Sequence, residues 1–216
     1  AVKEIALPSS KDSKKQLDLI EREIMLLEKM DHPNVVQCLG HEKLLDEGKI
    51  LIFMELVSAG SIRSVLKSFG PLTENQASRF TLQVLQGLSY LHKNKVAHRD
   101  LKGDNILFDG HGSVKLADFG AAKDLQSTMG HTVAGTAQFM APEVAQGSTY
   151  GLPADIWSLG CCVAEMCTGS SPFTSLGKNP FAVLAKIADM PSDQIPVPTH
   201  LSRSCQNFIR CCLQKD

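Results

Sequence analysis

The stretch that decides the fold is His98-Arg99-Asp100-Leu101-Lys102-Gly103-Asp104-Asn105, which Asp118-Phe119-Gly120 follows a short distance later. Phosphoryl transfer from a magnesium nucleotide needs one carboxylate beside the attacking hydroxyl. It also needs a second carboxylate and an amide oxygen to hold the metal. Asp100, Asp118 and Asn105 have these types and this order. Because four fixed identities at this spacing rarely occur by chance, the two segments together predict a phosphoryl-transfer site.

Length and composition place this site in an ordinary globular protein. The chain has 216 residues, of which 43% are hydrophobic, and this suits one globular unit or two small lobes that share a cleft. The formal net charge of −1 gives no basic field for nucleic acid or an anionic membrane. The longest apolar stretch, 156–167, contains Glu165 and is shorter than the roughly 18 residues of a membrane span, so we expect none.

The cysteines indicate a reducing environment. The seven are Cys38, Cys161, Cys162, Cys167, Cys205, Cys211 and Cys212, and none forms a C-x-x-C pair. Adjacent cysteines cannot chelate a metal as zinc ribbons do. The odd count and the apolar neighbours therefore predict buried, reduced thiols in a cytoplasmic protein.

The first part of the chain favours strands around one helix. Residues 1–7 alternate as a strand does, and the apolar runs 35–39 and 50–57 are also strand-like. Between them, apolar residues recur at helical spacing over 17–27.

The later part is mainly helical. Thr73 and Gln76 resemble a capping box that opens a long helix, and 106–116 has the pattern of a hairpin. A nearly all-apolar helix follows Pro153 and stops at Gly169, and a further helix starts at Asn179-Pro180. Strands first and helices later predict an α+β fold of two lobes.

These motifs, in this order, resemble a eukaryotic protein kinase domain along the whole chain. The series is Ala1-Val2-Lys3, a helix glutamate, the His-Arg-Asp loop, Asp-Phe-Gly, and Ala141-Pro142-Glu143. The resemblance implies a two-lobed kinase fold, with 1–57 as the N-terminal lobe and the start of the hinge, and 58–216 as the helical C-terminal lobe.

The resemblance also implies that the family's pattern is cut at both ends of this sequence. In the family, two strands and a G-x-G-x-x-G loop precede the strand lysine, so the N-terminal lobe is expected to be incomplete. Residues 213–216 match only the start of a closing motif whose arginine pairs with the glutamate at Glu143. A piece with these bounds is expected to bind ATP weakly and to transfer phosphate poorly.

By the same resemblance, Lys3 would grip the α- and β-phosphates of ATP. Its partner would be a glutamate on the following helix, and Glu23 fits best because Glu23-Ile24 matches the family's pattern. Glu21 and Glu28 are the rival candidates.

The central loop would carry the chemistry. Asp100 would accept the hydroxyl proton or orient the hydroxyl, and Lys102 would stabilise the transferring charge. Asn105 and Asp118 would hold Mg²⁺ through oxygen ligands. The family makes His98 structural, packed near Phe119, rather than a general base.

The adenine would bind at a hinge that begins at Met54, the expected gatekeeper. Backbone groups of Glu55 and Val57 would pair with the base, and Ala1 and Leu107 would lie above and below the ring.

Two threonines extend the resemblance. Lys102 and Thr136 match serine/threonine kinases, in which such a threonine bonds the catalytic aspartate and lysine. The next residues, Ala137 and Gln138, differ from the proline and aromatic residue of relatives, which leaves the detailed substrate preference open. Arg99 would pair with a phosphorylated activation-loop residue; Thr132 is the preferred site, and Ser127 and Thr128 are alternatives.

Asp155 begins the apolar helix and needs hydrogen bonds if it is buried. The resemblance implies that it accepts backbone N–H bonds from the catalytic loop. A helix N-cap is the other interpretation.

Within the superfamily, MAP kinase kinase kinases are most similar. The stretches that carry this likeness are His32-Pro33-Asn34-Val35-Val36, Gly60-Ser61-Ile62 and Phe69-Gly70-Pro71-Leu72. The substrate would then be a serine or threonine of a MAP kinase kinase, with ATP and Mg²⁺ as cofactors. The alternatives are a related upstream serine/threonine kinase and a pseudokinase that serves as a binding module.

Overall fold

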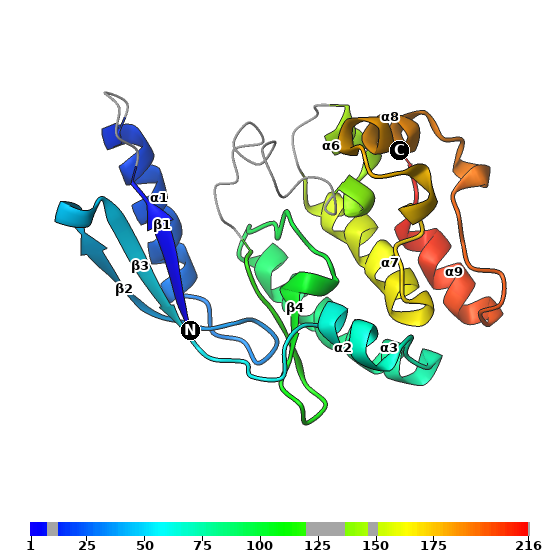
Figure 1. The fold of residues 1–216 in the computed structure, drawn as a ribbon, viewed down its shortest axis with the longest axis horizontal. Helices are drawn as coiled ribbons and strands as arrows, with labels where there is room; N and C mark the ends of the chain where they lie inside the picture. The colour runs from blue at the N-terminus through cyan, green and yellow to red at the C-terminus, as the bar shows by residue number, and fades with distance from the viewer. Residues whose placement is uncertain (8–12, 120–136, 147–150, 216) are drawn as a thin grey trace.

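A computed structural model gives the fold, and it describes residues 1–7, 13–119, 137–146 and 151–215. Figure 1 shows a small sheet with one helix at one end of the molecule and a larger, mainly helical part at the other. The predicted α+β class is confirmed.

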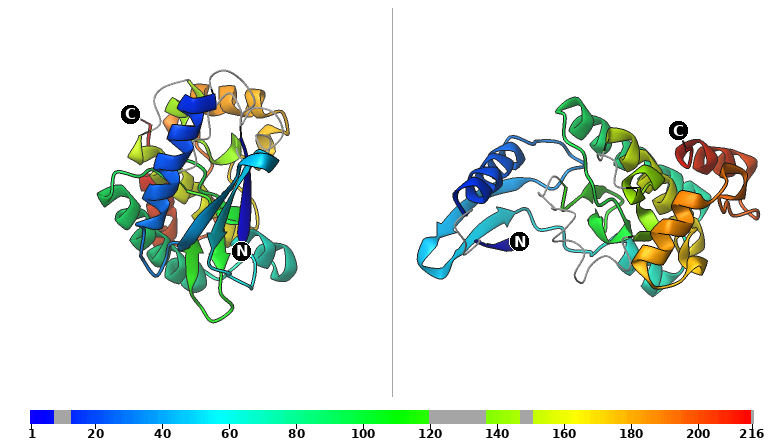
Figure 2. Two further views of the ribbon diagram at one scale, coloured as in Figure 1. Left: turned by 90° about the vertical axis from the view of Figure 1, so that its left-hand side faces the viewer. Right: turned by 90° about the horizontal axis from the view of Figure 1, so that it is seen from above.

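The small sheet is antiparallel. Its strands are β1 (Val2–Ala6), β2 (Cys38–Leu44) and β3 (Lys49–Met54), and β3 lies in the centre. Helix α1 (Ser13–Glu28) lies against the sheet, as Figure 2 shows from above. A compact apolar cluster joins them, formed by Ile24, Cys38, Ile50 and Ile52. The register sets Lys3 opposite Ile52, which fixes its place on the sheet.

The helical part is built around α7 (Leu152–Thr168), whose residues are buried on nearly all sides. It packs against α3 (Glu74–Lys93) and α9 (Arg203–Cys212), and Trp157 stacks on Phe173 with ring centroids 5.8 Å apart. The other helices of the described residues are α1 beside the sheet and α2 (Ile62–Phe69), α6 (Pro142–Ala145) and α8 (Pro180–Asp189) in the helical part. Short 3-10 turns are η1 (Leu45–Glu47), η2 (Gly103–Asn105), η3 (Ala137–Phe139), η4 (Thr174–Leu176) and η5 (Ser192–Gln194).

A hairpin connects the two parts. Its strands are β4 (Ile106–Phe108) and β5 (Val114–Leu116). Leu116 donates its N–H to the Asn34 carbonyl at 2.9 Å and accepts from the Val36 N–H at 2.9 Å. The segment that enters the sheet is therefore tied to the hairpin that follows the catalytic loop.

Most local predictions are confirmed. Thr73 and Gln76 form the expected capping box of α3, Asn179 caps α8, and Gly169 ends α7 in the left-handed conformation that favours glycine. The predicted strand over 35–39 is wrong for its first half. Val35 forms an isolated bridge to Leu116, and β2 starts only at Cys38, because the apolar residues before it pack against the hairpin.

The predicted burial of the thiols is confirmed at five of the seven positions. All seven cysteines are free, and Cys38, Cys161, Cys162, Cys167 and Cys212 are buried. Cys205 is half-buried, but Cys211 is exposed, so the prediction of burial is wrong there. Within the described ranges, no helix combines the length and the apolar character that crossing a membrane requires.

Candidate active site

Asp155 holds the start of the catalytic loop. Its carboxylate is fully buried in α7 and accepts the backbone N–H of His98 at 2.8 Å and of Arg99 at 3.0 Å. His92 Nε2 lies 2.7 Å from the same carboxylate. Burial opposes its ionisation, but these hydrogen bonds outweigh burial and lower the pKa of Asp155. The predicted bonds to the loop are thus confirmed. The N-cap alternative is wrong, because the N-cap of α7 is Gly151.

The backbone is strained on both sides of the site. Arg99 and Asp118 have φ of 68° and 56°, which is uncommon for residues with a Cβ. Such conformations persist only where surrounding contacts hold them, and they gather at functional sites. The Asp155 carboxylate supplies that hold at Arg99.

Asp100 is fixed by the two polar residues that follow it. Lys102 Nζ lies 3.2 Å from its Oδ1 and 3.1 Å from its Oδ2. Asn105 Nδ2 donates to the Asp100 carbonyl at 2.7 Å and to Oδ2 at 3.0 Å. All three side chains are almost completely buried. The carboxylate is therefore held in one orientation, with a cation beside it.

A single backbone bond brings Asp118 to this loop. The Ala117 N–H donates to the Asn105 carbonyl at 2.9 Å, and this bond holds the next residue, Asp118, close to the turn that carries Asn105. Lys3 Nζ reaches across from β1 to Asp118 Oδ1 at 2.6 Å. The His98 and Phe119 rings lie 6.3 Å apart, which agrees with the structural role predicted for His98.

The described partner of Lys3 is thus Asp118. Glu23 lies in α1, but its side chain is outside the described part of the structure, so the Lys3–Glu23 pair stays a prediction. Both rival glutamates bind elsewhere: Glu21 accepts from Lys43 Nζ at 2.6 Å, and Glu28 lies 2.7 Å from His41 Nδ1.

Backbone bonds to two neighbouring segments hold the predicted hinge in place. The Met54 N–H bonds to the Ala1 carbonyl at 2.8 Å, and the Glu55 N–H bonds to the Gln37 carbonyl at 3.0 Å. The Glu55 carboxylate also lies 2.8 Å from Lys115 Nζ, and this ion pair holds the Glu55 side chain in place. Among the described residues, no backbone bond engages the Glu55 carbonyl or the Val57 N–H. The half-buried Leu107 lies in β4, and the roles of Glu55, Val57 and Leu107 in adenine binding stay predictions.

The donor set fits magnesium. Because the Asn105 amide nitrogen is used by Asp100, its Oδ1 is left as the ligand end, and Asp118 adds carboxylate oxygens. Mg²⁺ prefers such oxygens and takes one or two protein carboxylates, with phosphates and water completing the shell. Over the described residues, no group of three or more His, Cys, Asp or Glu could hold a metal by itself.

Thr132 and Thr136 lie outside the described residues, so their predicted roles stay predictions. Two further contacts escaped the sequence analysis. One is His92 on Asp155, and the other is the ion pair of Arg63 with the buried Glu165. The sequence did indicate that Glu165 needs a partner, because a charged residue within an apolar helix must be paired.

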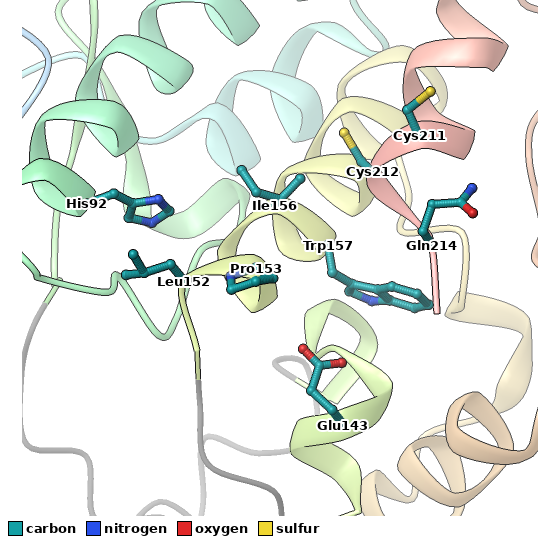
Figure 3. Close-up of a pocket in the computed structure, with 9 residues that line it drawn as sticks. All are labelled: His92, Glu143, Leu152, Pro153, Ile156, Trp157, Cys211, Cys212 and Gln214. Atoms are coloured by element: carbon teal, nitrogen blue, oxygen red, sulfur yellow. The ribbon is translucent and has the colours of Figure 1, made fainter. Parts of the chain in front are cut away.

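A separate pocket of about 380 Å³ opens where the ends of α3 and α9 meet α6 and α7 (Figure 3). It is lined by His92, Glu143, Leu152, Pro153, Ile156, Trp157, Cys211, Cys212 and Gln214, and Figure 3 shows the Glu143 carboxylate facing it below the Trp157 ring. None of these residues is a predicted site residue, so this pocket lies apart from the predicted chemistry.

Comparison with known proteins agrees with the geometry. The family model "Protein kinase domain" matches residues 1–216. The chain is 42% identical to human mitogen-activated protein kinase kinase kinase 3 over 208 residues, which cover 94% of this chain and 33% of that protein. It is 41% identical to human mitogen-activated protein kinase kinase kinase 19 and 40% identical to cell division control protein 7 of Schizosaccharomyces pombe. Both matches cover all of this chain, and 17% and 20% of the relatives. The chain thus spans about a third or less of these relatives, and it belongs to the protein kinase domain family.

Proposed function

We propose that the chain transfers the γ-phosphate of ATP to a serine or threonine of a protein. One observation carries this proposal. Asp100, held by Lys102 and Asn105, is joined through the Asn105–Ala117 bond to the segment that supplies Asp118. A base, a cation and two oxygen ligands are thereby gathered at one turn.

Each residue has a role in this proposal. Asp100 orients the acceptor hydroxyl and takes its proton, while Lys102 stabilises the charge that passes to the acceptor. Asn105 and Asp118 hold Mg²⁺, which neutralises charge on the phosphates when bound. Lys3 binds the α- and β-phosphates, and the Glu55 carbonyl and the Val57 N–H pair with the adenine between Ala1 and Leu107. Met54, as the gatekeeper, limits the depth of the adenine-binding pocket. Glu23 orients Lys3, and Thr136 shapes the site for a small hydroxyl.

The chain is proposed to be one kinase domain of two parts. Residues 1–57 form the N-terminal lobe with the start of the hinge, and 58–216 form the C-terminal lobe. Two apolar clusters support this division: one joins the sheet to α1, and the other fills the helical part and also takes in Met30 and Val35. A cytoplasmic location is proposed from the free thiols.

The proposed substrate is a MAP kinase kinase. The names of the similar human proteins, mitogen-activated protein kinase kinase kinases, support it. A related upstream serine/threonine kinase is the nearest alternative, because cell division control protein 7 is nearly as similar.

Phosphorylation of Thr132 is the proposed activating event. Arg99 is exposed beside Asp100, and its guanidinium suits a bidentate contact with a phosphate. Thr132→Ala is expected to abolish activation, and Thr132→Ala with undiminished activity would remove this part of the proposal.

Radiolabelled ATP tests the reaction. The full-length protein, with Mg²⁺ and an inactive MAP kinase kinase or myelin basic protein, is expected to label serine or threonine. Asp100→Asn should lose roughly 100-fold or more in kcat. The exposed Asp193 offers the matched control Asp193→Asn, which should keep full activity. Nucleotide binding without transfer by the parent chain would favour a binding module over an enzyme.

A further inference from the structure

An ion pair between Arg63 and the buried Glu165 lies beside the turn that carries Lys102 and Asn105. Glu165 lies in α7 with its side chain 1% exposed, and Arg63 lies in α2 with its side chain half exposed. Arg63 Nη1 donates to Glu165 Oε1. The pair therefore joins two helices on the far side of the turn that carries Lys102 and Asn105.

The Glu165 carboxylate lies against the turn that carries Lys102 and Asn105. A Cβ added to Gly103 would lie 2.4 Å from Glu165 Oε2 and 3.4 Å from the Arg63 backbone nitrogen. Gly103 is the first residue of η2, and the Asn105 N–H closes that turn on the Lys102 carbonyl at 2.9 Å. Only glycine, which has no side chain, lets the Glu165 carboxylate come this close to η2. The turn η2 therefore packs directly on that carboxylate.

Glu165 depends on Arg63 for its charge. Its Oε2 is buried and lacks a hydrogen bond of normal geometry from any described residue. Burial raises the pKa of Glu165, while Arg63 and the nearby Gly103 N–H oppose that rise. The other titratable groups that face it are Asp104 on η2 and the thiols of Cys161 and Cys162. Asp104 raises the pKa further, and burial raises the pKa of both thiols so far that they stay neutral. Arg63 is therefore the one cation among these groups.

We propose that Arg63 is a positioning residue for phosphoryl transfer: by holding Glu165 beneath Gly103, it fixes the turn that carries Lys102 and Asn105. This inference rests on the proposed function. It does not require Arg63 to touch ATP or the acceptor.

Loss of the arginine has a definite consequence. In Arg63→Met, the carboxylate remains in place only when it is protonated. As pH rises and it ionises, an unpaired buried charge must move toward water, and the turn moves with it. Lys102 and Asn105 then lose their alignment with Asp100, which lowers kcat far more than it changes the KM for ATP.

The test measures kcat and KM of the full chain from about pH 6 to about pH 9. Relative to the parent, kcat of Arg63→Met should fall roughly tenfold or more across this range, with KM for ATP changed by no more than about twofold. Arg63→Lys should restore much of the loss. The double variant Arg63→Met with Glu165→Gln should show no added pH dependence, because a neutral amide can stay where the carboxylate cannot. Lys67→Met, at an exposed lysine of the same helix, is the matched control and should follow the parent.

Two outcomes overturn the inference. One is a pH profile of Arg63→Met that coincides with that of the parent, and the other is a double variant as pH-dependent as Arg63→Met. The melting temperature gives a readout that needs no catalysis: the deficit of Arg63→Met relative to the parent should grow as pH rises. Asp100→Asn belongs in the same series, because full activity of that variant would refute the proposed function itself, whatever the Arg63 profiles show.

Discussion

Replacement of Asp155 by alanine tests the whole account of how the loop is held. The change removes a buried carboxylate that accepts two backbone N–H groups and faces His92. Each buried N–H left without an acceptor costs about 1–3 kcal/mol, so the variant should lose roughly 3–5 kcal/mol of unfolding free energy. That is a large part of the about 5–15 kcal/mol that stabilises a typical domain.

The loss should also reach the active site. Arg99 has the left-handed backbone that the Asp155 carboxylate holds in place, and relaxation of such a residue recovers about 1–3 kcal/mol. The loop is therefore expected to relax, and Asp100 to lose its position. Asp155→Asn keeps the size of the side chain and one acceptor oxygen, so its loss of unfolding free energy should be about half as large.

The assay is urea unfolding followed by tryptophan fluorescence. Trp157 is the chain's one tryptophan and lies on the same helix as Asp155, so it reports on the region that is perturbed. Asp193→Ala, at an exposed carboxylate, is the control. A midpoint of Asp155→Ala equal to that of the parent at neutral pH would show that these bonds do not hold the loop.

The pH dependence has a fixed sign. The folded pKa of Asp155 is lowered, so its contribution is fully present above the unfolded value of about 4 and is lost as pH falls through the folded pKa. The difference between the parent and Asp155→Ala should therefore shrink in acid. A difference that grows as pH falls would contradict the cause given for the shift.

Three further changes have outcomes that the structure fixes. Gly103→Ala would set a Cβ 2.4 Å from Glu165 Oε2, so a lower melting temperature and a large loss of kcat are expected in scanning calorimetry and kinase assays. Ellman's reagent should modify Cys211 of the native protein quickly, because this thiol is exposed. Cys161 and Cys162 should react slowly, because burial shields both thiols and raises their pKa. Rapid reaction of all seven thiols without denaturant would contradict this packing. Thr73→Ala removes the cap of α3 and should cost about 1 kcal/mol, or roughly 2–4 °C in melting temperature.

The sequence predicted the features that local chemistry specifies. The capping residues Thr73 and Gln76, the hairpin over 106–116 and the αL glycine at Gly169 each depend on neighbours within a few positions. The meeting of Asp100, Lys102 and Asn105 was also predictable, because phosphoryl transfer requires these residue types close together. The bond from Ala117 to Asn105 that joins the two segments of the site follows from the short hairpin between them.

Features that depend on distant partners were not predictable. Glu165 needed a cation, but nothing in the sequence distinguishes Arg63, 102 positions away, from the other basic residues. The apolar character of 35–39 was read correctly, yet its first residues serve packing and a single bridge rather than a ladder. Cys211 and Cys212 are neighbours of one type, but successive residues of a helix point in different directions, so one is exposed and the other buried.

The contact between Lys3 and Asp118 has a thermodynamic consequence. At 2.6 Å, the ammonium already neutralises the carboxylate that is proposed to bind the metal. A metal ion alone would have to compete with the lysine, and a nucleotide alone would have to draw the lysine away from the carboxylate. With both bound, Lys3 would contact phosphate and Asp118 would contact the metal. Binding of the nucleotide and of the metal should therefore be positively cooperative, each increasing the affinity for the other by the same factor.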